Sequence, residues 1–598
     1  MIKFPKENFV LLETNKFDKD NYRSFLFLNP HRIISCHRLE DVKESLFELG
    51  DFLSKGYYAA GFISYEAGFS FEEYLKGHIE KDLNFPLLWF GIYKKPLVFP
   101  HREKIDLLQN GKSPYAIKNL RPNISKKEYI SNVNKIKNFI RRGDTYQVNY
   151  TFKYKFDFHG SLYGFYEDLK AKQSVSYSAF MKSPEFSILS LSPELFFRKN
   201  KNHMEVKPMK GTIQRGRDLQ DDMRNINKLR HSLKDRSENV MIVDLLRNDL
   251  GRISRTGTVK TKGLFEVERY ETLLQMISVV KSVLKRDVTP YSLFKAIFPS
   301  GSVTGAPKIS TMNIINTLEK EPRHIYTGSI GFFSPGGIES VFNVAIRTVV
   351  IDNRTLSGEM GIGSGIVYDS DPCKEFEECR LKADFITHKK RDCRLIETIL
   401  WRRKKGYFLL KYHMDRLFAS LEYFNFKFDK NYIIVKLKNL EKHLEDDSDY
   451  KVRLLLDIDG KAELSYSAIR KDTKSAKVRM SLRKTSSKDV FLYHKTTNRD
   501  LYEEEFETWQ RHGYFDVIFT NEKNQITEGA ISNIIIKKGR FYYTPPVECG
   551  LLNGVFRRYL LDSGKIPLYE KILYRKDIKD ADEVYLINSV RGMTKVDL

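Results

Sequence analysis

The sequence predicts a layered α+β region that is followed by a second α/β region in the same chain. Its length of 598 residues and its hydrophobic content of 41% allow two to four domains with sizeable cores. Strand-like apolar runs alternate with helical patterns over the first 390 residues. After a charged stretch at 387–392, a new α/β pattern starts at Cys393. We therefore expect one domain over 1–390 and another over 391–598, without internal repeats.

Composition and charge indicate a globular protein with a basic surface. The net charge is +24, but the 101 Lys and Arg residues are mixed with 77 Asp and Glu, which favours a solvated surface over a nucleic-acid interface. Such a surface also favours small anionic substrates. The five cysteines have neither zinc-site nor disulfide spacing. Because the N-terminus lacks a signal-peptide pattern and no apolar run approaches 18 residues, we expect a cytoplasmic protein that does not enter a membrane.

Local patterns predict the elements of the first region. Strand patterns follow from runs of apolar and β-branched residues between turn residues, and helical patterns from apolar residues at three- and four-residue spacing. The elements expected are strands at 58–65, 145–150, 186–198, 204–208, 258–261 and 341–351, and helices at 126–142 and 218–250.

The helix expected at 238–252 has apolar side chains on all sides, so we expect it to be buried. It nevertheless carries Glu238, Asp244, Arg247 and Asp249, and buried charges need partners. One interpretation is an internal salt-bridge network. The other is a metal site.

Two acidic pairs with the same spacing favour the metal site. Asp235 lies three residues before Glu238, and Glu375 lies three before Glu378, so each pair occupies one helix face. If the two pairs meet, they repel unless a divalent cation lies between them. All-oxygen ligands on rigid helices suit Mg²⁺. We therefore expect a magnesium site.

The strand expected at 341–351 places Arg347 on a face with the small Ala345, which leaves room for a carboxylate. The alternative is a strand face that is exposed to water. Residues 361–367 follow, and their glycines let backbone N–H groups approach an anion closely. Taken alone, this segment is equally consistent with a tight turn.

Six separated motifs resemble the chorismate-utilising enzymes, a family that includes anthranilate synthase, isochorismate synthase and aminodeoxychorismate synthase component I. The resemblance covers about the first 390 residues and implies a large α/β sandwich with the active site deep between its sheets. The motifs lie at 143–149, 192–196, 207–212, in the helix that carries Glu238, at 298–308 and at 361–383.

The resemblance also implies the residues of a chorismate site. Glu238 and Glu378 would bind Mg²⁺, with Asp235 and Glu375 acting through water, and the metal would neutralise the ring carboxylate of chorismate. Further substrate contacts would come from Gln147, from Tyr326 and Arg347 at the enolpyruvyl carboxylate, and from Lys382 with the amides of Gly363, Ser364 and Gly365 at the ring carboxylate.

Two positions distinguish the members of this family. Members that add water have a lysine base where this sequence has Gln147, and glutamine cannot take that proton, so ammonia is the better nucleophile. Lys210 resembles the aminodeoxychorismate synthases, whereas anthranilate synthases usually have alanine there. The implied mechanism is attack of the Lys210 amine on C2 with loss of the C4 hydroxyl, followed by attack of ammonia on C4. The alternative role for Lys210 is a plain substrate-binding cation.

Two departures from the family pattern are Ser300, where glycine is common, and Gln275, where histidine is common. They do not choose between members. No cysteine lies in a Gly-x-Cys-x-Gly turn, so we expect the ammonia to come from a separate glutamine amidotransferase subunit.

Residues 393–598 resemble the fold-type IV pyridoxal phosphate enzymes, which have a two-subdomain α/β fold and usually dimerise, so a homodimer through this domain is possible. The resemblance makes Lys495 the residue that holds pyridoxal 5'-phosphate and Glu528 the partner of the pyridine nitrogen. Other cofactor contacts implied are Arg416, Ser532, Asn533, and Gly554, Val555 and Phe556 at the start of a helix. Strands are expected at 490–493 and in a hairpin at 516–529.

Within this second group, Asn553 followed by Gly554, and the motif at 588–592 with Arg591 as a substrate contact, resemble aminodeoxychorismate lyases more than aminotransferases. The main hypothesis is therefore a bifunctional enzyme that converts chorismate to 4-aminobenzoate, a folate precursor. One alternative is an anthranilate synthase fused to a branched-chain or D-amino acid aminotransferase-like enzyme. The other is a basic nucleic-acid-binding or scaffold protein with decayed active sites.

Overall fold

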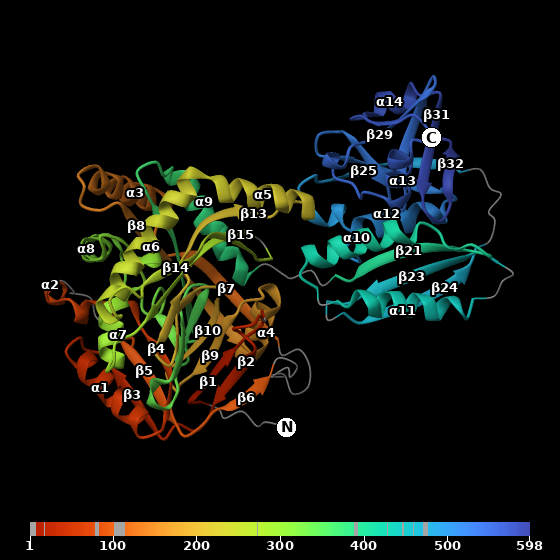
Figure 1. Cartoon of the computed structure of the whole chain (residues 1–598). Coiled ribbons are helices and arrows are strands. Elements are labelled where there is room, and N and C mark those ends of the chain that lie inside the picture. The colour runs from red at the N-terminus through yellow and green to blue at the C-terminus, as the bar shows by residue number, and fades with distance from the viewer. Residues whose placement is uncertain are drawn as a thin grey trace. The chain divides into compact units, whose positions relative to one another are not determined.

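The computed structural model describes residues 7–598 except 17, 78–82, 101–113, 272, 388–392, 427, 445–447, 459 and 470–475. The chain forms two compact units, which are described separately (Figure 1). The first comprises Met1–Gln214 and Asn227–Lys390, and the second comprises Arg215–Ile226 and Arg391–Leu598. The boundary expected between residues 390 and 391 lies outside the described residues.

The first sheet of the first unit is antiparallel and contains β8, the long strand that begins at Gln147. Its order is β16 (Gly305–Ala306), β8 (Gln147–Gly160), β20 (Ser357–Ile366), β19 (Thr348–Asp352), β10 (Phe186–Ser192), β9 (Tyr177–Lys182), β1 (Phe9–Glu13), β2 (Arg23–Phe27) and β6 (Leu97–Pro100), with β7 (Tyr115–Pro122) beside β8.

The second sheet is also antiparallel and contains β13, the strand that carries Lys210. Its order is β13 (Met209–Gln214), β15 (Leu273–Val283), β12 (His203–Val206), β11 (Leu195–Asn200), β18 (Glu339–Asn343), β17 (Ser329–Phe333), β4 (Tyr58–Ile63), β5 (Leu88–Tyr93) and β3 (Arg32–Cys36), with β14 (Lys260–Arg269) beside β15.

Helices cover the outer face of each sheet. α3 (Lys126–Arg141), α4 (Leu162–Lys172) and α9 (Pro372–Ala383) pack on the first sheet, and α1 (Asp41–Ser54), α6 (Leu233–Ile253) and α7 (Pro290–Ile297) pack on the second. Each sheet forms an apolar core with its helices, and another apolar core, which includes Phe62 and Ile188, lies between the two sheets. Since each large apolar side chain contributes roughly 1.5–3 kcal/mol when buried, these layers hold the sandwich together. The remaining helical segments of this unit are α2 (Glu73–Lys76), α8 (Lys308–Leu318), η1 (Tyr65–Phe71), η2 (Gly301–Val303), η3 (Pro335–Gly337) and η4 (Asp384–Ile386). The residues of α5 (Leu219–His231) up to Ile226 belong to the second unit, and the others belong to the first.

Most elements expected in this unit are present, and three expectations are wrong. The strand expected at 186–198 is divided into β10 and β11, which belong to different sheets. The strand expected at 341–351 is interrupted: β18 ends at Asn343, β19 begins at Thr348, and Arg347 between them has a left-handed φ of 52°. Its alternating pattern therefore comes from two strands that belong to different sheets. The helix expected to be wholly buried, α6, is amphipathic instead. Asp244 and Arg247 pair with each other at 2.8 Å on its exposed face.

The second unit contains a small sheet covered by helices and a larger mixed sheet. The small sheet has the order β22 (Gly406–Tyr407), β21 (Leu395–Arg402), β23 (Tyr450–Leu456) and β24 (Ala462–Ala468), with α10 (Leu410–Tyr423) and α11 (Lys430–Glu441). The larger sheet contains β25 (Val478–Thr485), β26 (Asp516–Asn521), β27 (Ile526–Gly529), β28 (Asn533–Lys538), β29 (Phe541–Thr544), β30 (Leu568–Glu570), β31 (Glu583–Asn588) and β32 (Gly592–Val596). Its helical segments are η5 (Val490–Tyr493), α12 (Asp500–Arg511), η6 (Val547–Cys549), α13 (Val555–Ser563) and α14 (Arg575–Lys579).

The hairpin expected at 516–529 is confirmed, because β26 and β27 pair antiparallel. The strand expected at 490–493 is wrong: η5 is a 3₁₀ turn, and the Asp489 carboxylate accepts from the amide of Phe491 at its start.

The segment 215–226 is held within the second unit by polar contacts, although it lies far from residues 391–598 in sequence. Arg215 Nη2 donates to the carbonyl of Tyr423 at 2.8 Å, the Tyr423 hydroxyl donates to the carbonyl of Gly216 at 2.6 Å, and His494 Nε2 lies 3.1 Å from the carbonyl oxygen of Arg217. Sequence patterns did not predict this exchange of a segment.

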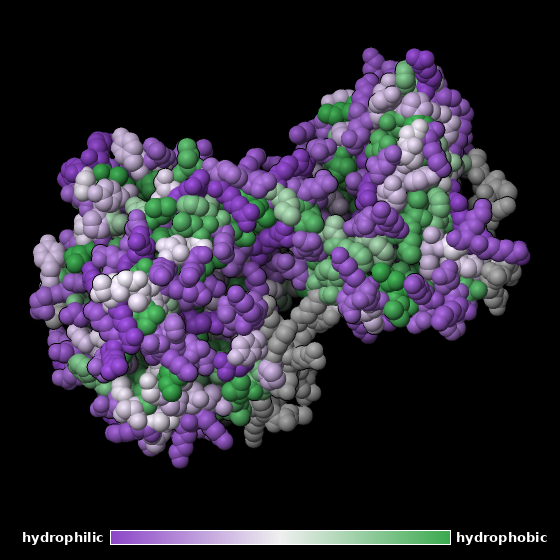
Figure 2. Space-filling view, viewed as in Figure 1, coloured by the Kyte–Doolittle hydropathy of each residue, from purple (hydrophilic) through white to green (hydrophobic). Residues whose placement is uncertain are grey.

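Hydrophilic residues cover most of the visible surface, and apolar residues form small scattered groups (Figure 2). No helix in the described part of the chain is both long and apolar enough to cross a membrane.

Candidate active sites

Lys210 and Gln147 lie side by side in the first unit, next to Gly365 of β20. A methyl group built on Gly365 would lie 2.6 Å from Gln147 Nε2 and 3.5 Å from Lys210 Nζ. Burial lowers the pKa of the Lys210 amine, and the carboxylates of Glu238 and Glu194 oppose this shift. The side chain of Gln147 is buried, and neither its nitrogen nor its oxygen has a hydrogen-bond partner in the structure. These atoms are available to a substrate.

Glu194 is a site residue to which sequence reasoning gave no role. Its side chain is 4% exposed, and its Oε1 accepts a hydrogen bond from Ser302 Oγ at 2.6 Å. Burial raises its pKa to about 7, although Ser302 and Lys210 act to lower it. A carboxyl group with this pKa can give and take protons near neutral pH. Glu194 lies within the motif at 192–196, but the resemblance assigned it no role.

The four carboxylates expected to bind Mg²⁺ lie on α6 and α9. Burial raises the pKa of Glu238, and the negative charges of Asp235 and Glu375 raise it further. Glu378 is paired with Lys382 at 2.8 Å, and Glu375 accepts from a serine hydroxyl at 2.9 Å. Within the described residues, no group of three or more potential ligands is close enough to hold a metal ion. The expected cluster is therefore not assembled in this conformation.

The chemistry of these donors nevertheless fits Mg²⁺. All four are carboxylates, and a cation would offset the repulsion that raises the pKa of Glu238. Strand β13 packs closely on the first turn of α6: a methyl group on Gly211, whose φ is +86°, would lie 2.9 Å from Asp235 Cβ. This glycine allows the strand that carries Lys210 to approach the acidic helix.

Tyr326 and Arg347 come from neighbouring turns that are joined by backbone hydrogen bonds. The amide of Thr327 donates to the carbonyl of Ala345 at 2.9 Å, and the amide of Ala345 donates to Gly328 at 2.9 Å. Burial lowers the pKa of Arg347 to about 10. Its guanidinium makes no hydrogen bond or ion pair with the described residues. A partly buried guanidinium that makes no ion pair with the described residues is suited to a substrate carboxylate.

The glycine-containing strand β20 has one open edge beside these residues. β19 pairs with β20 only at Gly358–Met360, so residues 361–366 are paired on the β8 side alone. Lys382 Nζ donates to the carbonyl of Gly363 at 3.1 Å, which brings this lysine to the strand. The side chain of Ser364 instead contacts Tyr129 at 2.9 Å in the core. Ser364 can therefore serve a ligand through its backbone only.

Lys495 and Glu528 have the electrostatic properties that a pyridoxal phosphate site needs. Burial lowers the pKa of Lys495 to about 7, and Arg499 and Arg416 add to the effect. Glu528 is 5% exposed, and burial raises its pKa to about 7. The Tyr502 hydroxyl donates to Glu528 at 3.2 Å. Tyr502 and Arg499 were not recognised from the sequence as site residues.

Asn533 connects Glu528 to the start of α13. Its Nδ2 lies 3.1 Å from Glu528 Oε2 and 2.9 Å from the carbonyl of Leu552. A methyl group on Gly554 would lie 1.9 Å from Asn533 Oδ1, so only glycine fits at this helix start. Gly554 offers no side-chain cap, which leaves the first amides of α13, including Val555 and Phe556, available for a phosphate.

Of the remaining contacts expected in the second unit, Arg416 and Ser532 donate to buried carboxylates, whereas Arg591 is exposed. Arg416 donates to both oxygens of Glu397 at 2.9 and 2.7 Å, and Ser532 donates to the buried Asp516. Although burial acts to raise it, Arg416 and His413 hold the pKa of Glu397 at about 2. Arg591 is exposed, and its guanidinium lies 4.8 Å from the centre of the Phe515 ring.

These groups fit pyridoxal 5'-phosphate: a lysine with a lowered pKa, a buried acid, and a helix start with free amides. His413 Nε2 is also buried without a partner in the structure. The described contacts do not bring Arg591 to Lys495.

Comparisons with known proteins identify a family for each of two successive parts of the chain. The chorismate binding enzyme family matches residues 16–388, and the amino-transferase class IV family matches residues 394–598. A probable chloroplastic aminodeoxychorismate synthase from Oryza sativa subsp. japonica is 42% identical over 274 residues, which cover 45% of this chain and 30% of that protein. Aminodeoxychorismate synthase component 1 from Salmonella typhimurium is 32% identical over 348 residues, which cover 55% of this chain and 76% of that protein.

A crystal structure of anthranilate synthase component I from Streptococcus pneumoniae has a TM-score of 0.54 and 26% sequence identity, and the match covers 63% of this chain and 94% of that chain. The chain thus spans under a third of the rice protein and about three quarters of the Salmonella protein. The fold class expected from the sequence is confirmed. The chain belongs to the chorismate binding enzyme family and carries a class IV aminotransferase domain in its second part.

Proposed function

We propose that the chain converts chorismate to 4-aminobenzoate in two steps, one in each unit. The observation that carries the first step is the Lys210 amine, which lies beside Gln147. Burial lowers its pKa against the opposing charges of Glu238 and Glu194. The aminodeoxychorismate synthases named above support the same assignment.

In the first step, the unprotonated Lys210 amine attacks C2 of chorismate, the ring double bonds shift, and the C4 hydroxyl leaves as water with a proton from Glu194. Ammonia then attacks C4, the bond between C2 and Lys210 breaks, and the new C4 ammonium group gives one proton back to Glu194. The products are 4-amino-4-deoxychorismate and water. Arg347 and Tyr326 bind the enolpyruvyl carboxylate, and Lys382 with the amides of β20 orients the ring carboxylate.

Mg²⁺, when bound by Glu238 and Glu378 with Asp235 and Glu375 behind them, supplies positive charge that neutralises the ring carboxylate of the substrate. For this arrangement, Glu378 must exchange its ion pair with Lys382 for the metal. Lys382 is then free to bind the substrate.

In the second step, the second unit eliminates pyruvate from 4-amino-4-deoxychorismate. Pyridoxal 5'-phosphate, when bound, supplies an electron sink. Lys495 holds the cofactor and then takes the proton from C4 of the substrate, for which a pKa near 7 is suitable. Glu528 would keep the pyridine nitrogen of the bound cofactor protonated. The leaving enolpyruvyl group becomes pyruvate as the ring becomes aromatic.

We expect ammonia to come from a separate glutamine amidotransferase subunit. The Salmonella relative is named component 1, which supports a synthase with more than one component. The net charge of +24 also favours the approach of chorismate, which is an anion.

The proposed function is tested by incubating the full chain with chorismate, Mg²⁺, an ammonium salt and pyridoxal 5'-phosphate. The expected aromatic product is 4-aminobenzoate, together with one equivalent of pyruvate. Without the cofactor, 4-amino-4-deoxychorismate should accumulate. Formation of 2-aminobenzoate would instead indicate anthranilate synthesis, and retention on polyanions without any turnover would indicate the nucleic-acid-binding alternative.

Glu194 predicts a specific pH dependence of the first step. Because the leaving hydroxyl needs the protonated acid, the rate should fall as pH rises through about 7, the pKa of Glu194. Replacing Glu194 with glutamine should lower kcat for amination by about 100-fold or more at pH 6.5 to 7 and remove this fall. The measurement is a pH profile at constant free ammonia. An unchanged profile in the variant would exclude Glu194 as the acid.

A further inference from the structure

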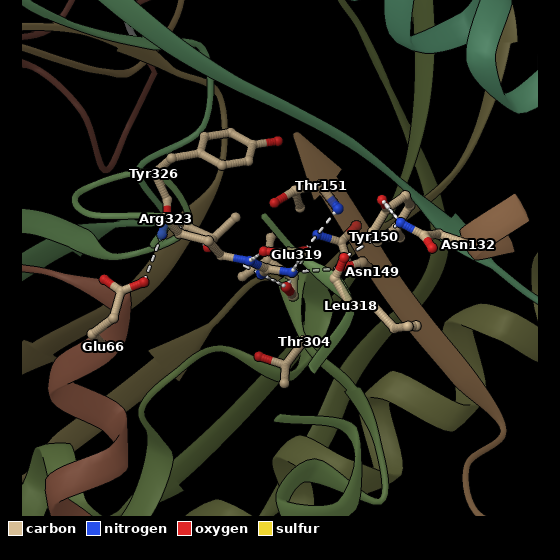
Figure 3. A network of polar contacts seen from close by, with 12 residues as sticks. Glu66, Asn132, Asn149, Tyr150, Thr151, Thr304, Leu318, Glu319, Arg323 and Tyr326 are labelled. Carbon is tan, nitrogen blue, oxygen red and sulfur yellow. Dashed lines mark hydrogen bonds and ion pairs between the residues drawn. The ribbon is translucent and has the colours of Figure 1, made fainter. Parts of the chain in front are cut away.

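Arg323 is a buried arginine whose hydrogen-bonding groups are all used within the protein (Figure 3). Its side chain is 2% exposed, and its Nε and Nη2 donate to the two oxygens of Glu319 at 2.8 and 2.6 Å. Nη2 also donates to the carbonyl of Asn149 at 2.6 Å, and Nη1 donates to the carbonyl of Val303 at 2.9 Å and to Thr327 Oγ1 at 3.2 Å. A guanidinium has five N–H groups, so none remains for a ligand.

The acceptors of these bonds belong to three segments that carry proposed chorismate contacts or pack against them. Asn149 lies two residues after Gln147 on β8, and Thr327 directly follows Tyr326. The carbonyl of Val303 also accepts from Asn149 Nδ2 at 3.1 Å, which ties the loop containing η2 to the same strand. One side chain therefore sets the separation between the strand of Gln147 and the turn of Tyr326.

Two carboxylates, Glu319 and Glu66, hold Arg323 itself in place. Glu319 accepts from the amide of Thr151 at 2.8 Å. Both Arg323 and Glu319 are therefore hydrogen-bonded to the backbone of β8. The carboxylate of Glu66 accepts from the amides of Arg323 at 2.6 Å and His324 at 3.0 Å. Figure 3 shows Glu66 on the opposite side of Arg323 from Glu319. Charges buried to this degree with complete hydrogen bonding hold one geometry strongly, because losing one partner leaves the other unpaired.

We propose that Arg323 is a positioning residue for the conversion of chorismate, and that Glu319 fixes its orientation. Arg323 does not touch the substrate, because all its donors are engaged inside the wall of the site. It acts through the backbone of β8 near Gln147 and through the turn that bears Tyr326. The inference rests on the proposed function of the first unit.

Two variants of the full chain test this role, together with a matched control. Arg323→Lys keeps the positive charge but cannot supply five donors in one plane. Glu319→Gln keeps the shape of its side chain but removes the charge. Glu13→Gln is the control, because Glu13 is 7% exposed and pairs with Lys170 at 3.0 Å in the same unit, on β1 and α4.

The readout is the separate effect on kcat and KM for chorismate, measured with Mg²⁺ and ammonium. A displaced site wall should raise KM by at least tenfold and lower kcat by about 100-fold, since small displacements have effects of this size. The control should keep KM within twofold of the unsubstituted chain. In all three variants, the second unit should convert supplied 4-amino-4-deoxychorismate at the unsubstituted rate.

A variant that only reduces the folded fraction lowers kcat and leaves KM unchanged, and that result would overturn the proposal. So would a KM within twofold of the unsubstituted value in either variant. If Arg323→Lys does not fold, Glu319→Gln decides the question by the same criterion. If the unsubstituted chain forms no aminated product from chorismate, the proposed function has failed, which is a different outcome from an unchanged KM.

Discussion

Replacing Lys210 with alanine is expected to abolish amination of chorismate at C4. The loss should be at least about a thousandfold in kcat, which corresponds to about 4 kcal/mol of transition-state stabilisation. The reason is chemical: without an amine at this position, the C4 hydroxyl must leave without the attack at C2 that drives the double-bond shift. Burial, which lowers the pKa of Lys210, provides the unprotonated amine that the attack requires.

Two control variants separate a nucleophile from a binding cation. Lys210→Arg keeps the positive charge but is not nucleophilic at neutral pH, so it should be as inactive as alanine. Lys382→Ala should raise KM for chorismate and leave C4 as the site of amination. If the arginine variant kept more than a tenth of the activity, Lys210 would be a substrate-binding cation only.

The intermediate offers a second, independent measurement. When ammonia is withheld, chorismate should form a covalent adduct on Lys210 with the mass of chorismate less one water. Rapid denaturation and peptide mass spectrometry would locate this adduct. Its absence from the peptide that contains Lys210, in a preparation that aminates chorismate once ammonia is added, would contradict the covalent mechanism.

The sequence predicted those features of the fold that depend on local pattern. The helix expected at 126–142 and the hairpin expected at 516–529 are present because apolar spacing and turn residues determine such elements over a few residues. The continuous strand expected at 341–351 was wrong for a reason that local pattern cannot reveal. The alternating pattern runs across the break at Arg347 although β19 is buried on both faces from Thr348 to Ile351, so the alternation reports neither the break nor the burial of this strand.

Site residues whose role depends on distant partners could not be recognised from the sequence. Glu194 acquires its raised pKa through burial in the folded chain, and the serine that hydrogen-bonds to it, Ser302, lies 108 residues away in the sequence. Arg323 binds Asn149, which is 174 residues away. Lys210 and Gln147 were identified from the resemblance to a family, and the structure places both side chains beside Gly365.

The predicted magnesium ligands illustrate what sequence spacing can and cannot decide. The three-residue spacing correctly placed each acidic pair on one helix, with Asp235 and Glu238 on α6 and Glu375 and Glu378 on α9. It could not show that Glu378 is paired with a lysine on its own helix. A cation and Lys382 compete for the Glu378 carboxylate, and the spacing of residues in the sequence does not show which of them binds it more strongly.

Replacing Lys495 with alanine is expected to abolish the second step and to leave the first step intact. The chain should then release 4-amino-4-deoxychorismate from chorismate, and conversion of supplied 4-amino-4-deoxychorismate to 4-aminobenzoate should fall at least about a thousandfold, or about 4 kcal/mol. Lysine at this position holds the cofactor and moves the C4 proton, and alanine can do neither. Lys537→Ala is the matched control, because Lys537 pairs with Glu583 at 3.3 Å in the same unit.

Absorbance provides a readout that does not depend on turnover. The unsubstituted chain should shift the absorbance of added pyridoxal 5'-phosphate, and Lys495→Ala should not, whereas the control should behave like the unsubstituted chain. Since burial lowers the pKa of Lys495 to about 7, the fraction of unprotonated amine rises as pH increases through 7, and cofactor binding should become faster over that range. A Lys495→Ala chain that kept both the shift and the elimination of pyruvate would assign the cofactor to another lysine and remove the basis for the proposed second step.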